Sequence, residues 1–593
     1  MSETVVFEIP RATGTHGDVF LVAGLAELLA SVAEGPVQLR AHGATYEVRA
    51  SLVDGWDTRL PVGAGYRYLR PKAKAAVPVG IPSDLVLDYE AERERVAQYY
   101  KQRQAVGRKP PADPELAAWL EQNAPRPDWR HWQLLNLLQG DDNTNKVFLR
   151  LFELPESTAR AAIVQGLRAL QQGQPSGLSW GVSSVQLFTP NAAKGYARLK
   201  PDSTDRNDKT KEAWVDPFVE WLRYRGYFQV ACPFFVDSKA ERIRVLTPEP
   251  ADVSAKGLVT VADKLRRAPP YGAEPKLDAL AVLFLARVLI EHSELYQPAE
   301  PVAEPPIPLF TLYGKTPAQV ISGVAITQYV SMGSARVVAH LGELALPDWF
   351  PMESPADAQA WVAILDEHRR VLAGLRDDRS DEIGLLIAYR RFLQARGAAA
   401  LDALLDFMGA YGPFVLRARE LKRRVAQFTT ENFRALVGRM MGTYLEILDD
   451  PGFRAVAAAV RRATVSAQSL KALGRTDYRE IRYDLLPEIR RRRSLPDSNA
   501  LIETIADFIA SYNAENARRR ELRQPAPPNV TTEEFRAFAL LVEKYQAPLV
   551  GALLAAYGSC REPREVAAEP EVSEPTAESE EVLPAAVEPT EGE

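Results

Sequence analysis

Two adjacent carboxylates are the first residues of this sequence with the potential for chemistry. Asp141 and Asp142 follow Gly140 in the stretch Leu-Leu-Gln-Gly-Asp-Asp-Asn-Thr-Asn-Lys-Val-Phe, residues 137–148. Such a pair holds a divalent metal ion when a strand hairpin presents it and a third carboxylate converges on it. The preceding residues 128–138 have the apolar spacing of a helix. We therefore expect a polar loop after a helix, with the aspartates in a turn or at a helix N-cap.

The polar residues after the aspartates are better suited to contacts with a nucleic acid. Asn143, Asn145 and Lys146 carry groups that can bind phosphates and base edges. A second polar segment, residues 191–214, adds basic side chains, amides, a glycine and a tyrosine. Its candidate contact residues are Lys194, Arg198, Lys200, Arg206, Asn207 and Lys209. A turn in the first segment and a solvated loop in the second are the structural alternatives, and three aspartates within 194–211 favour the latter.

Local patterns of catalytic and metal-binding residues are missing from the sequence. None of the six histidines has another at ligand spacing, and Cys232 and Cys560 are the only cysteines. No phosphate-binding loop, nucleophile elbow or dinucleotide fingerprint stands between a strand and a helix. We expect no catalytic centre, no metal and no cofactor, and a site assembled from distant residues is the alternative left open.

The net charge of −6 conceals two segments of opposite sign. Residues 565–593 hold ten Glu and no Lys or Arg, so the remainder carries +4. Residues 416–525 hold 22 Lys and Arg against 14 Asp and Glu, with basic runs at 417–424 and 488–494. We interpret this segment as a surface for a polyanion, rather than as a solvated helix face. Its candidate contact residues are Arg490, Arg491, Arg492 and Arg493.

Hydrophobic periodicity predicts an α+β chain that begins with a mixed region, residues 1–345. The predicted strands are 4–9, a hairpin at 37–50 with its turn at His42 and Gly43, 184–189, 227–232, 241–246 and parts of 318–341. The predicted helices are 17–35, 84–105, 252–266 and 275–296. Five prolines within 297–308 indicate a linker or a surface crossing.

The second part, residues 350–560, is predicted to be an all-helical bundle. The expected helices are 356–375, 382–410, 413–427, 430–449, 451–466, 477–491, 497–520 and 532–557. Sequences typical of helix N-caps stand at 429–433 and 531–535. Residues 561–593 are rich in Glu, Pro and Ala and bury too little to fold, so we expect a disordered acidic tail.

The sequence also indicates a cellular compartment. No apolar run is long and uncharged enough to span a bilayer, and the first residues lack the basic and apolar regions of a signal peptide. Two cysteines cannot form a disulfide framework. We expect a cytoplasmic protein with no membrane contact.

The C-terminal sequence resembles the helical half of the large subunit of type I CRISPR effector complexes (Cascade), with subtypes I-A and I-B nearest. The stretches that carry the resemblance are 428–448, 460–468, 481–494, 501–520 and 530–558, and within them the pair Tyr512-Asn513 in an Arg-rich helix is the most telling. The N-terminal stretches 13–30, 138–149, 188–200 and 215–228 are consistent with the same family.

This resemblance implies a non-catalytic subunit that binds a crRNA-loaded backbone of repeated subunits and target double-stranded DNA. Such a subunit recognises the protospacer-adjacent motif and recruits a helicase-nuclease. The two N-terminal polar segments would read the motif, and the basic bundle would line the path of a DNA strand. Some relatives carry a zinc ribbon, which Cys232 alone cannot form.

In this family, translation from an internal start sometimes yields the C-terminal helical part as a separate small subunit, and the resemblance implies that this chain could do the same. Met408, Met440 and Met441 are candidate starts, and Met408 suits best because Met440 falls inside an expected helix.

Two rival functions stay open. One is a palm-type polymerase or cyclase-like large subunit with metal at Asp141 and Asp142, and the other is a helical scaffold that binds protein only.

Overall fold

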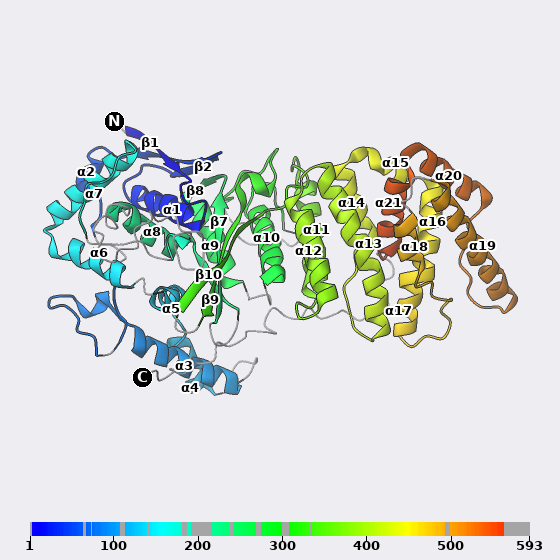
Figure 1. Cartoon of the computed structure of the whole chain (residues 1–593), viewed down its shortest axis with the longest axis horizontal. Helices are drawn as coiled ribbons and strands as arrows, with labels where there is room; N and C mark the ends of the chain where they lie inside the picture. The colour runs from blue at the N-terminus through cyan, green and yellow to red at the C-terminus, as the bar shows by residue number, and fades with distance from the viewer. Residues whose placement is uncertain are drawn as a thin grey trace. The chain divides into compact units, whose positions relative to one another are not determined.

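A computed structural model describes residues 3–62, 67–72, 74–106, 113–138, 141–180, 187–190, 216–236, 241–268, 274–298, 308–332, 335–492 and 498–562, with backbone alone at 141–143, 335 and 492. These residues form two compact units (Figure 1). Of the described residues, those up to 268 and those of 318–345 belong to the first unit, and those of 274–317 and 346–562 belong to the second. The first is mixed α/β and the second is helical, which confirms the predicted fold class.

Antiparallel sheets form the framework of the first unit. One has the order β1 (Glu3–Pro10), β3 (Thr45–Leu52), β2 (Gln38–His42) and β8 (Asp252–Ser254). The other has the order β10 (Ala335–Ala345), β9 (Ile321–Met332), β7 (Arg242–Pro250) and β6 (Cys232–Phe235). The predicted hairpin is confirmed as β2 and β3, and Gly43 turns between them with φ +57°. A short parallel pair joins β4 (Tyr68–Arg70) to β5 (Val86–Asp88).

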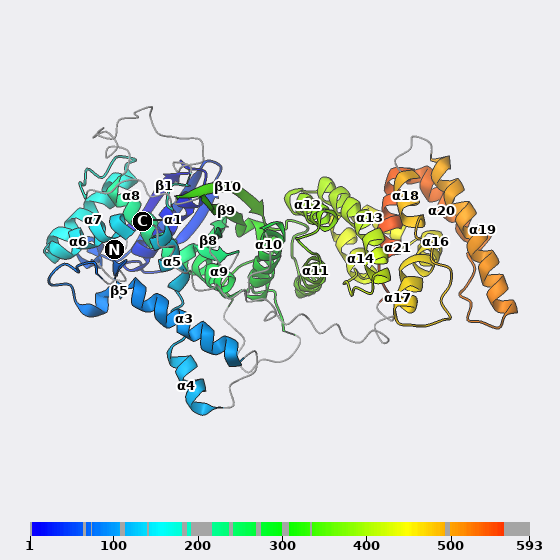
Figure 2. The same ribbon diagram turned by 60° about the horizontal axis from the view of Figure 1, so that its bottom comes forward.

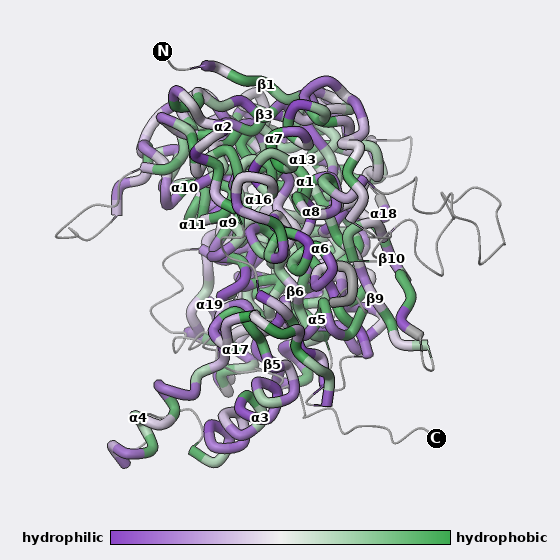
Figure 3. Tube along the Cα trace, turned by 90° about the vertical axis from the view of Figure 1, so that its left-hand side faces the viewer, coloured by the Kyte–Doolittle hydropathy of each residue, from purple (hydrophilic) through white to green (hydrophobic). Residues whose placement is uncertain are grey.

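The helices of the first unit differ in how deeply they are buried. They are α1 (His16–Ala30), α2 (Trp56–Arg59), η1 (Ser83–Leu85), α3 (Tyr89–Val106), α4 (Pro114–Gln122), α5 (Trp129–Leu137), α6 (Asp141–Glu153), α7 (Glu156–Gln171), α8 (Pro217–Val230) and α9 (Ala255–Arg267). Helix α1 is buried along most of its length. Helices α3 and α4 stand apart from both sheets (Figure 2), and α3 is hydrophilic along most of its length (Figure 3).

The expected strand at 227–232 is wrong, because α8 runs through most of it. Asp216 caps this helix by accepting the backbone N–H groups of Phe218 and Val219, and Pro217 occupies its first position. The strand β6 begins only at Cys232. The expected strand at 184–189 lies largely outside the described residues, and its last part, from Leu187, is a turn.

The second unit is built from helices. They are α10 (Glu274–Glu291), α11 (Pro355–Ala373), α12 (Ser380–Gln394), α13 (Ala398–Glu420), α14 (Thr430–Met440), η5 (Gly442–Tyr444), α15 (Leu445–Leu448), α16 (Pro451–Arg461), a π-helical turn η6 (Arg462–Ser466), α17 (Ala467–Ala472), α18 (Leu485–Arg492), α19 (Asn499–Glu521), α20 (Thr532–Tyr545) and α21 (Ala547–Ser559). Both predicted N-caps are confirmed. Thr429 accepts the N–H of Asn432, and Thr531 forms a capping box with Glu534.

Several helix boundaries in the second unit differ from the prediction. The expected break near 410–413 is absent, and Pro413 lies inside α13. The ring removes one helical hydrogen bond, but burial of Tyr411, Phe414 and Val415 holds this stretch in place. The break comes earlier instead, at Gly397 with φ +57°.

The proline-rich stretch 297–308 is flanked by residues that pair with each other. Leu309 donates its backbone N–H to the carbonyl of His292 at 2.8 Å, so the chain returns to the end of α10. Residues 299–307 themselves lie outside the described residues. Helix α10 packs against α11 and α12, so it belongs to the helical unit although it lies before the expected boundary at 345–350.

Helix α13 is the one helix in the described part of the chain with the length and apolar composition of a membrane span. Of its most apolar window, 67% is buried inside the structure. Its buried side chains contact α12, α18 and α21. This burial is that of a core helix in a bundle.

Candidate nucleic-acid interface

The stretch that contains the two aspartates has a helical setting. Helix α5 ends at Leu137 and α6 begins at Asp141. The polar loop expected within residues 137–148 is therefore wrong from residue 141 onward, and the two aspartates stand at the start of a helix, near the alternative N-cap position. Carboxylates in the first turn of a helix are favoured by the helix dipole, which accounts for Asp141 and Asp142 at this position. The described residues 128–138 and 141–153 contain no strand hairpin of the kind that a palm-type metal site requires.

Asn145 binds the backbone at the edge of β4. Its Oδ1 accepts the backbone N–H of Leu69 at 2.9 Å, and its Nδ2 donates to the carbonyl of the same residue at 2.8 Å. The amide thus takes the place of a neighbouring strand beside β4, and both of its polar groups are used. Lys146 is exposed on the next position of α6, and the side chain of Asn143 lies outside the described residues.

The second predicted contact segment is not described by the structure. Its six candidates, Lys194, Arg198, Lys200, Arg206, Asn207 and Lys209, lie within residues 191–215, outside the described residues.

The basic run at the end of α18 is only partly described. Arg490 and Arg491 are exposed, and Arg491 forms an ion pair with Glu488 at 2.5 Å. The side chain of Arg492 and the whole of Arg493 lie outside the described residues. In the other run, Arg419 is buried and donates to the carbonyl of Val465 at 3.4 Å.

Much of the positive charge of residues 416–525 is balanced inside the fold. The basic side chains that form ion pairs there are Arg423, Arg434, Arg439, Arg454, Arg461, Lys471, Arg475, Arg479, Arg482 and Arg491. Three of these pairs, those of Arg423, Arg439 and Arg461, use carboxylates from outside the segment, so the excess of +8 overstates the charge that is available to a partner.

A groove of about 710 Å³ in the second unit collects four arginines. It lies among α14, α16, α20, α21 and residues 528–530, and α16, α20 and α21 lie side by side (Figure 1). The arginines are Arg434, Arg454, Arg461 and Arg462, and the acidic residues on its walls are Glu431, Glu534 and Glu562. None of these arginines is among the contact residues predicted from the sequence, although Arg454, Arg461 and Arg462 stand at positions i, i+7 and i+8 of α16 and the π-helical turn that follows it.

One carboxylate holds two of the groove's arginines. Arg434 donates from Nε and Nη2 to Asp449 at 2.7 and 2.6 Å, and Arg454 donates to the same carboxylate at 2.5 Å. The hydrogen bonds from Arg434 lower the pKa of Asp449 below its usual value, so the carboxylate stays ionised. Two cations share one anion here, which leaves capacity for a second anion.

Arg461 is the most deeply placed cation of the groove, with 3% of its surface exposed. Its Nη2 pairs with the carboxylate of Glu562, while its Nη1 has no hydrogen-bond partner in the described part of the chain. A buried, unsatisfied donor on a charged group costs free energy, and an anionic ligand would satisfy it. Arg462 follows at the start of a π-helical turn, half-buried and without an ion pair to any described residue.

Helix α19 positions one wall of the groove. Asn513 donates to the carbonyl of Val530 at 2.8 Å and accepts the N–H of Val530 at 3.1 Å. Asn516 donates to the side chain of Asn529 at 3.1 Å. Arg479 stacks its guanidinium 3.8 Å from the centre of the Tyr512 ring. Asn513 and Asn516 therefore fix residues 528–530.

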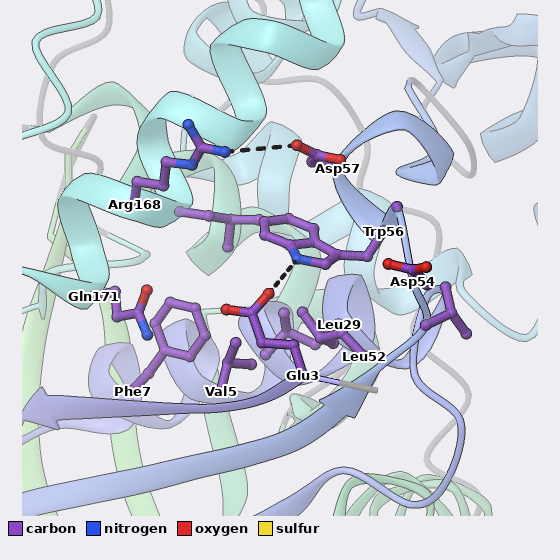
Figure 4. Close-up of a pocket in the computed structure, with 13 residues that line it drawn as sticks. Glu3, Val5, Phe7, Leu29, Leu52, Asp54, Trp56, Asp57, Arg168 and Gln171 are labelled. Atoms are coloured by element: carbon purple, nitrogen blue, oxygen red, sulfur yellow. Dashed lines mark hydrogen bonds and ion pairs between the residues drawn. The ribbon is translucent and has the colours of Figure 1, made fainter. Parts of the chain in front are cut away.

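A smaller pocket of about 250 Å³ lies in the first unit among β1, β3, α2 and α7 (Figure 4). Its polar walls pair with each other: Trp56 donates to Glu3 at 3.3 Å, and Arg168 lies 3.5 Å from Asp57. Three carboxylates, including Asp54, line it against one arginine. This excess of negative charge disfavours a phosphate ligand.

Burial shifts the pKa values of the buried histidines and of a cysteine in the described part of the chain away from neutral pH. Burial lowers the pKa of His16 to about 4, and of His131 and His368 to about 3. Burial raises the pKa of Cys232 to about 12. The described residues contain no cluster of three or more His, Cys, Asp or Glu that could hold a metal ion.

The chain was compared with models of protein families and with curated proteins. No model of a protein family matches the chain, and no curated protein matches it.

Proposed function

We propose that this chain is a non-catalytic large subunit of an RNA-guided antiviral surveillance complex of the type I CRISPR (Cascade) class. It binds the crRNA-loaded backbone and target double-stranded DNA, recognises the protospacer-adjacent motif and recruits the helicase-nuclease. Its partners are the other Cascade subunits, and it acts in the cytoplasm. The sequence resemblance and the order of a mixed α/β unit and a helical unit support this proposal.

The arginine groove is the observation that carries the nucleic-acid part of the proposal. Guanidinium groups bind phosphate oxygens through two parallel hydrogen bonds, and they stay charged at any physiological pH. Among the described residues, Nη1 of Arg461 has no hydrogen-bond partner and Arg462 has no ion-pair partner, and both provide such groups within one concave surface. Contacts of this kind bind the backbone of a nucleic acid without reading its sequence.

Equilibrium binding of labelled double-stranded and single-stranded DNA to the full chain tests this proposal. We expect binding at low salt that weakens steeply as salt rises, because bound phosphates release counterions. Arg462→Ala should weaken binding by roughly tenfold, since it removes a charge-assisted contact of about 1.4 kcal/mol. Arg475→Ala, an exposed arginine paired with Asp477 outside the groove, is the matched control and should change binding less than about twofold.

A helical scaffold that binds protein only is the second candidate. The internal ion pairs of residues 416–525 favour it, because they consume much of the basic charge. A scaffold predicts little DNA binding at either salt concentration and no response to Arg462→Ala. Either result would overturn the nucleic-acid proposal.

A further inference from the structure

The groove already holds one carboxylate that arrives from the C-terminal end of the described chain. Arg561 donates its N–H to the carbonyl of Phe428 at 2.9 Å, and Thr430 donates its N–H to the carbonyl of Arg561 at 2.9 Å. These two bonds hold the chain beside the start of α14. Residues 561–562, which the sequence analysis assigned to the tail, are thus part of the folded unit. The next residue, Glu562, pairs with Arg461.

The chain that continues from this point has a strongly acidic sequence. Residues 565–593 contain ten Glu and neither Lys nor Arg. Glu562 is the last described residue, and it is also one of the residues that line the groove. The acidic sequence therefore starts at the groove that contains the four arginines.

We propose that residues 563–593, called here the acidic segment, dock in the arginine groove and compete there with the phosphates of a nucleic acid. This inference rests on the proposed function for the identity of the competitor, but the docking itself is independent of it. Glu562 makes the first contact of the docked state, and the later glutamates reach the remaining cations.

Charge and tethering both support this occupant. Without Glu562, the four arginines of the groove face Glu431 and Glu534 on its walls, and Arg434 and Arg454 share Asp449. Four cations then stand against three carboxylates, and Glu534 is engaged in the capping box with Thr531. The buried Nη1 of Arg461 and the side chain of Arg462 lack anionic partners among the described residues. The acidic segment continues directly from Glu562, and a short covalent connection gives an effective concentration on the order of millimolar, so weak contacts suffice for docking.

The first test measures docking without any nucleic acid. In the full-length chain, each of the ten glutamates of 565–593 is replaced by Gln, which removes the carboxylates beyond Glu562 but keeps the chain length. A fluorescent peptide of residues 563–593 is then added. We expect the neutralised chain to bind it at least tenfold more tightly than the unmodified chain, whose groove is occupied. Arg462→Ala in the neutralised chain should weaken peptide binding at least fivefold, whereas Arg475→Ala should leave it unchanged.

The docking is overturned if the neutralised chain does not bind the peptide, or if Arg462→Ala leaves the peptide affinity unchanged. The second test compares DNA binding by the two full-length chains at low salt, where we expect the neutralised chain to bind about tenfold more tightly. Equal DNA affinities also overturn the inference. If neither chain binds DNA while the peptide result holds, the proposed function fails and the docking stands.

Discussion

At the scale of single residues, two asparagines each bind the backbone N–H and carbonyl of a residue far away along the chain. Asn145 binds both backbone groups of Leu69, and Asn513 binds both backbone groups of Val530. An amide suits this task because it carries one acceptor and two donors. The sequence predicted a nucleic-acid contact for Asn145, since the same groups also read base edges. Its backbone partner lies 76 residues away along the chain, where no local pattern indicates it.

We predict that Asn513→Ala destabilises the helical unit. The substitution leaves the N–H and carbonyl of Val530 without their partners, and such a loss costs about 1–3 kcal/mol of unfolding free energy. Glu503→Ala, exposed on the same helix, is the control and should cost less than about 0.5 kcal/mol. Urea denaturation of both variants measures the difference, and equal midpoints would show that the two bonds contribute nothing.

A buried carboxylate on α11 predicts an unusual dependence of stability on pH. Burial raises the pKa of Glu367 from 4.5 to about 6, although its Oε2 accepts hydrogen bonds from Thr429 and Asn432. The folded state therefore binds a proton more tightly than the unfolded state. Below the unfolded pKa both states are protonated and no penalty exists. As pH rises through 6, the folded state must ionise a buried group, which costs about 2 kcal/mol.

Glu367→Gln tests this dependence, because an amide does not titrate. Between pH 4.5 and pH 7, we expect the unfolding free energy of the unmodified chain to fall relative to that of the variant by about 2 kcal/mol. Glu503→Gln, at an exposed position, should follow the unmodified chain at each pH. Parallel curves for all three proteins would mean that Glu367 ionises normally.

At the scale of elements, the closest packing in the first unit joins α1 and α8. A Cβ on Gly226 would lie 1.8 Å from the carbonyl oxygen of Phe20, and a Cβ on Gly24 would lie 1.9 Å from that of Leu222. Backbone atoms occupy both positions, so no side-chain rotation can relieve the overlap. The two helices can approach this closely only with glycine at both points.

Gly226→Ala should therefore destabilise the first unit by at least about 3 kcal/mol, because the added methyl group forces the helices apart. Gly384→Ala is the matched control, since it also lies in a helix and its Cβ would meet nothing within 4 Å. It should stabilise the chain by about 0.5–1 kcal/mol through helix propensity. Thermal unfolding of the two variants gives shifts of opposite sign, and a neutral Gly226→Ala would contradict the close packing.

Elements with local signals could be predicted from the sequence, and elements fixed by tertiary contacts could not. The hairpin of β2 and β3 has alternating apolar and polar residues and a turn at a glycine. Thr429 and Thr531 are residue types typical of the helix N-cap and mark where their helices begin. The aromatic and β-branched residues of 227–232 resemble a strand, but packing of α8 on α1 through Gly226 makes most of them helical. Pro413 suggests a helix end, and its buried neighbours override that signal.

At the scale of the whole molecule, the order of the two parts followed from sequence periodicity, whereas the candidate site did not. The groove joins residues from Thr430 to Glu562, so its arginines converge only after α14, α16 and α21 have packed. The sequence shows how much basic charge a segment carries, but not that Arg434 and Arg454 share Asp449. Ion pairs within the fold decide which arginines are available to bind a ligand.

The packing of the helical unit bears on whether a separate small subunit can start at Met408. This residue is 1% exposed and lies inside α13, so the start cuts that helix, just as a start at Met440 cuts α14. It also removes α12, which packs along α13. We expect the fragment from Met408 to Glu593 to lack a cooperative unfolding transition and to bind hydrophobic dyes, in contrast to the full chain.

Circular dichroism during thermal unfolding, together with dye fluorescence, measures this difference. We expect this difference because α12 packs along α13 in the full chain and the fragment lacks α12. The buried side chains that remain on α13, up to Val415, are then exposed to water. A fragment that unfolds cooperatively and binds DNA with the sensitivity to Arg462→Ala expected of the full chain would reverse this conclusion. It would show that α14 to α21 form a separable unit and that the groove needs no other part of the chain.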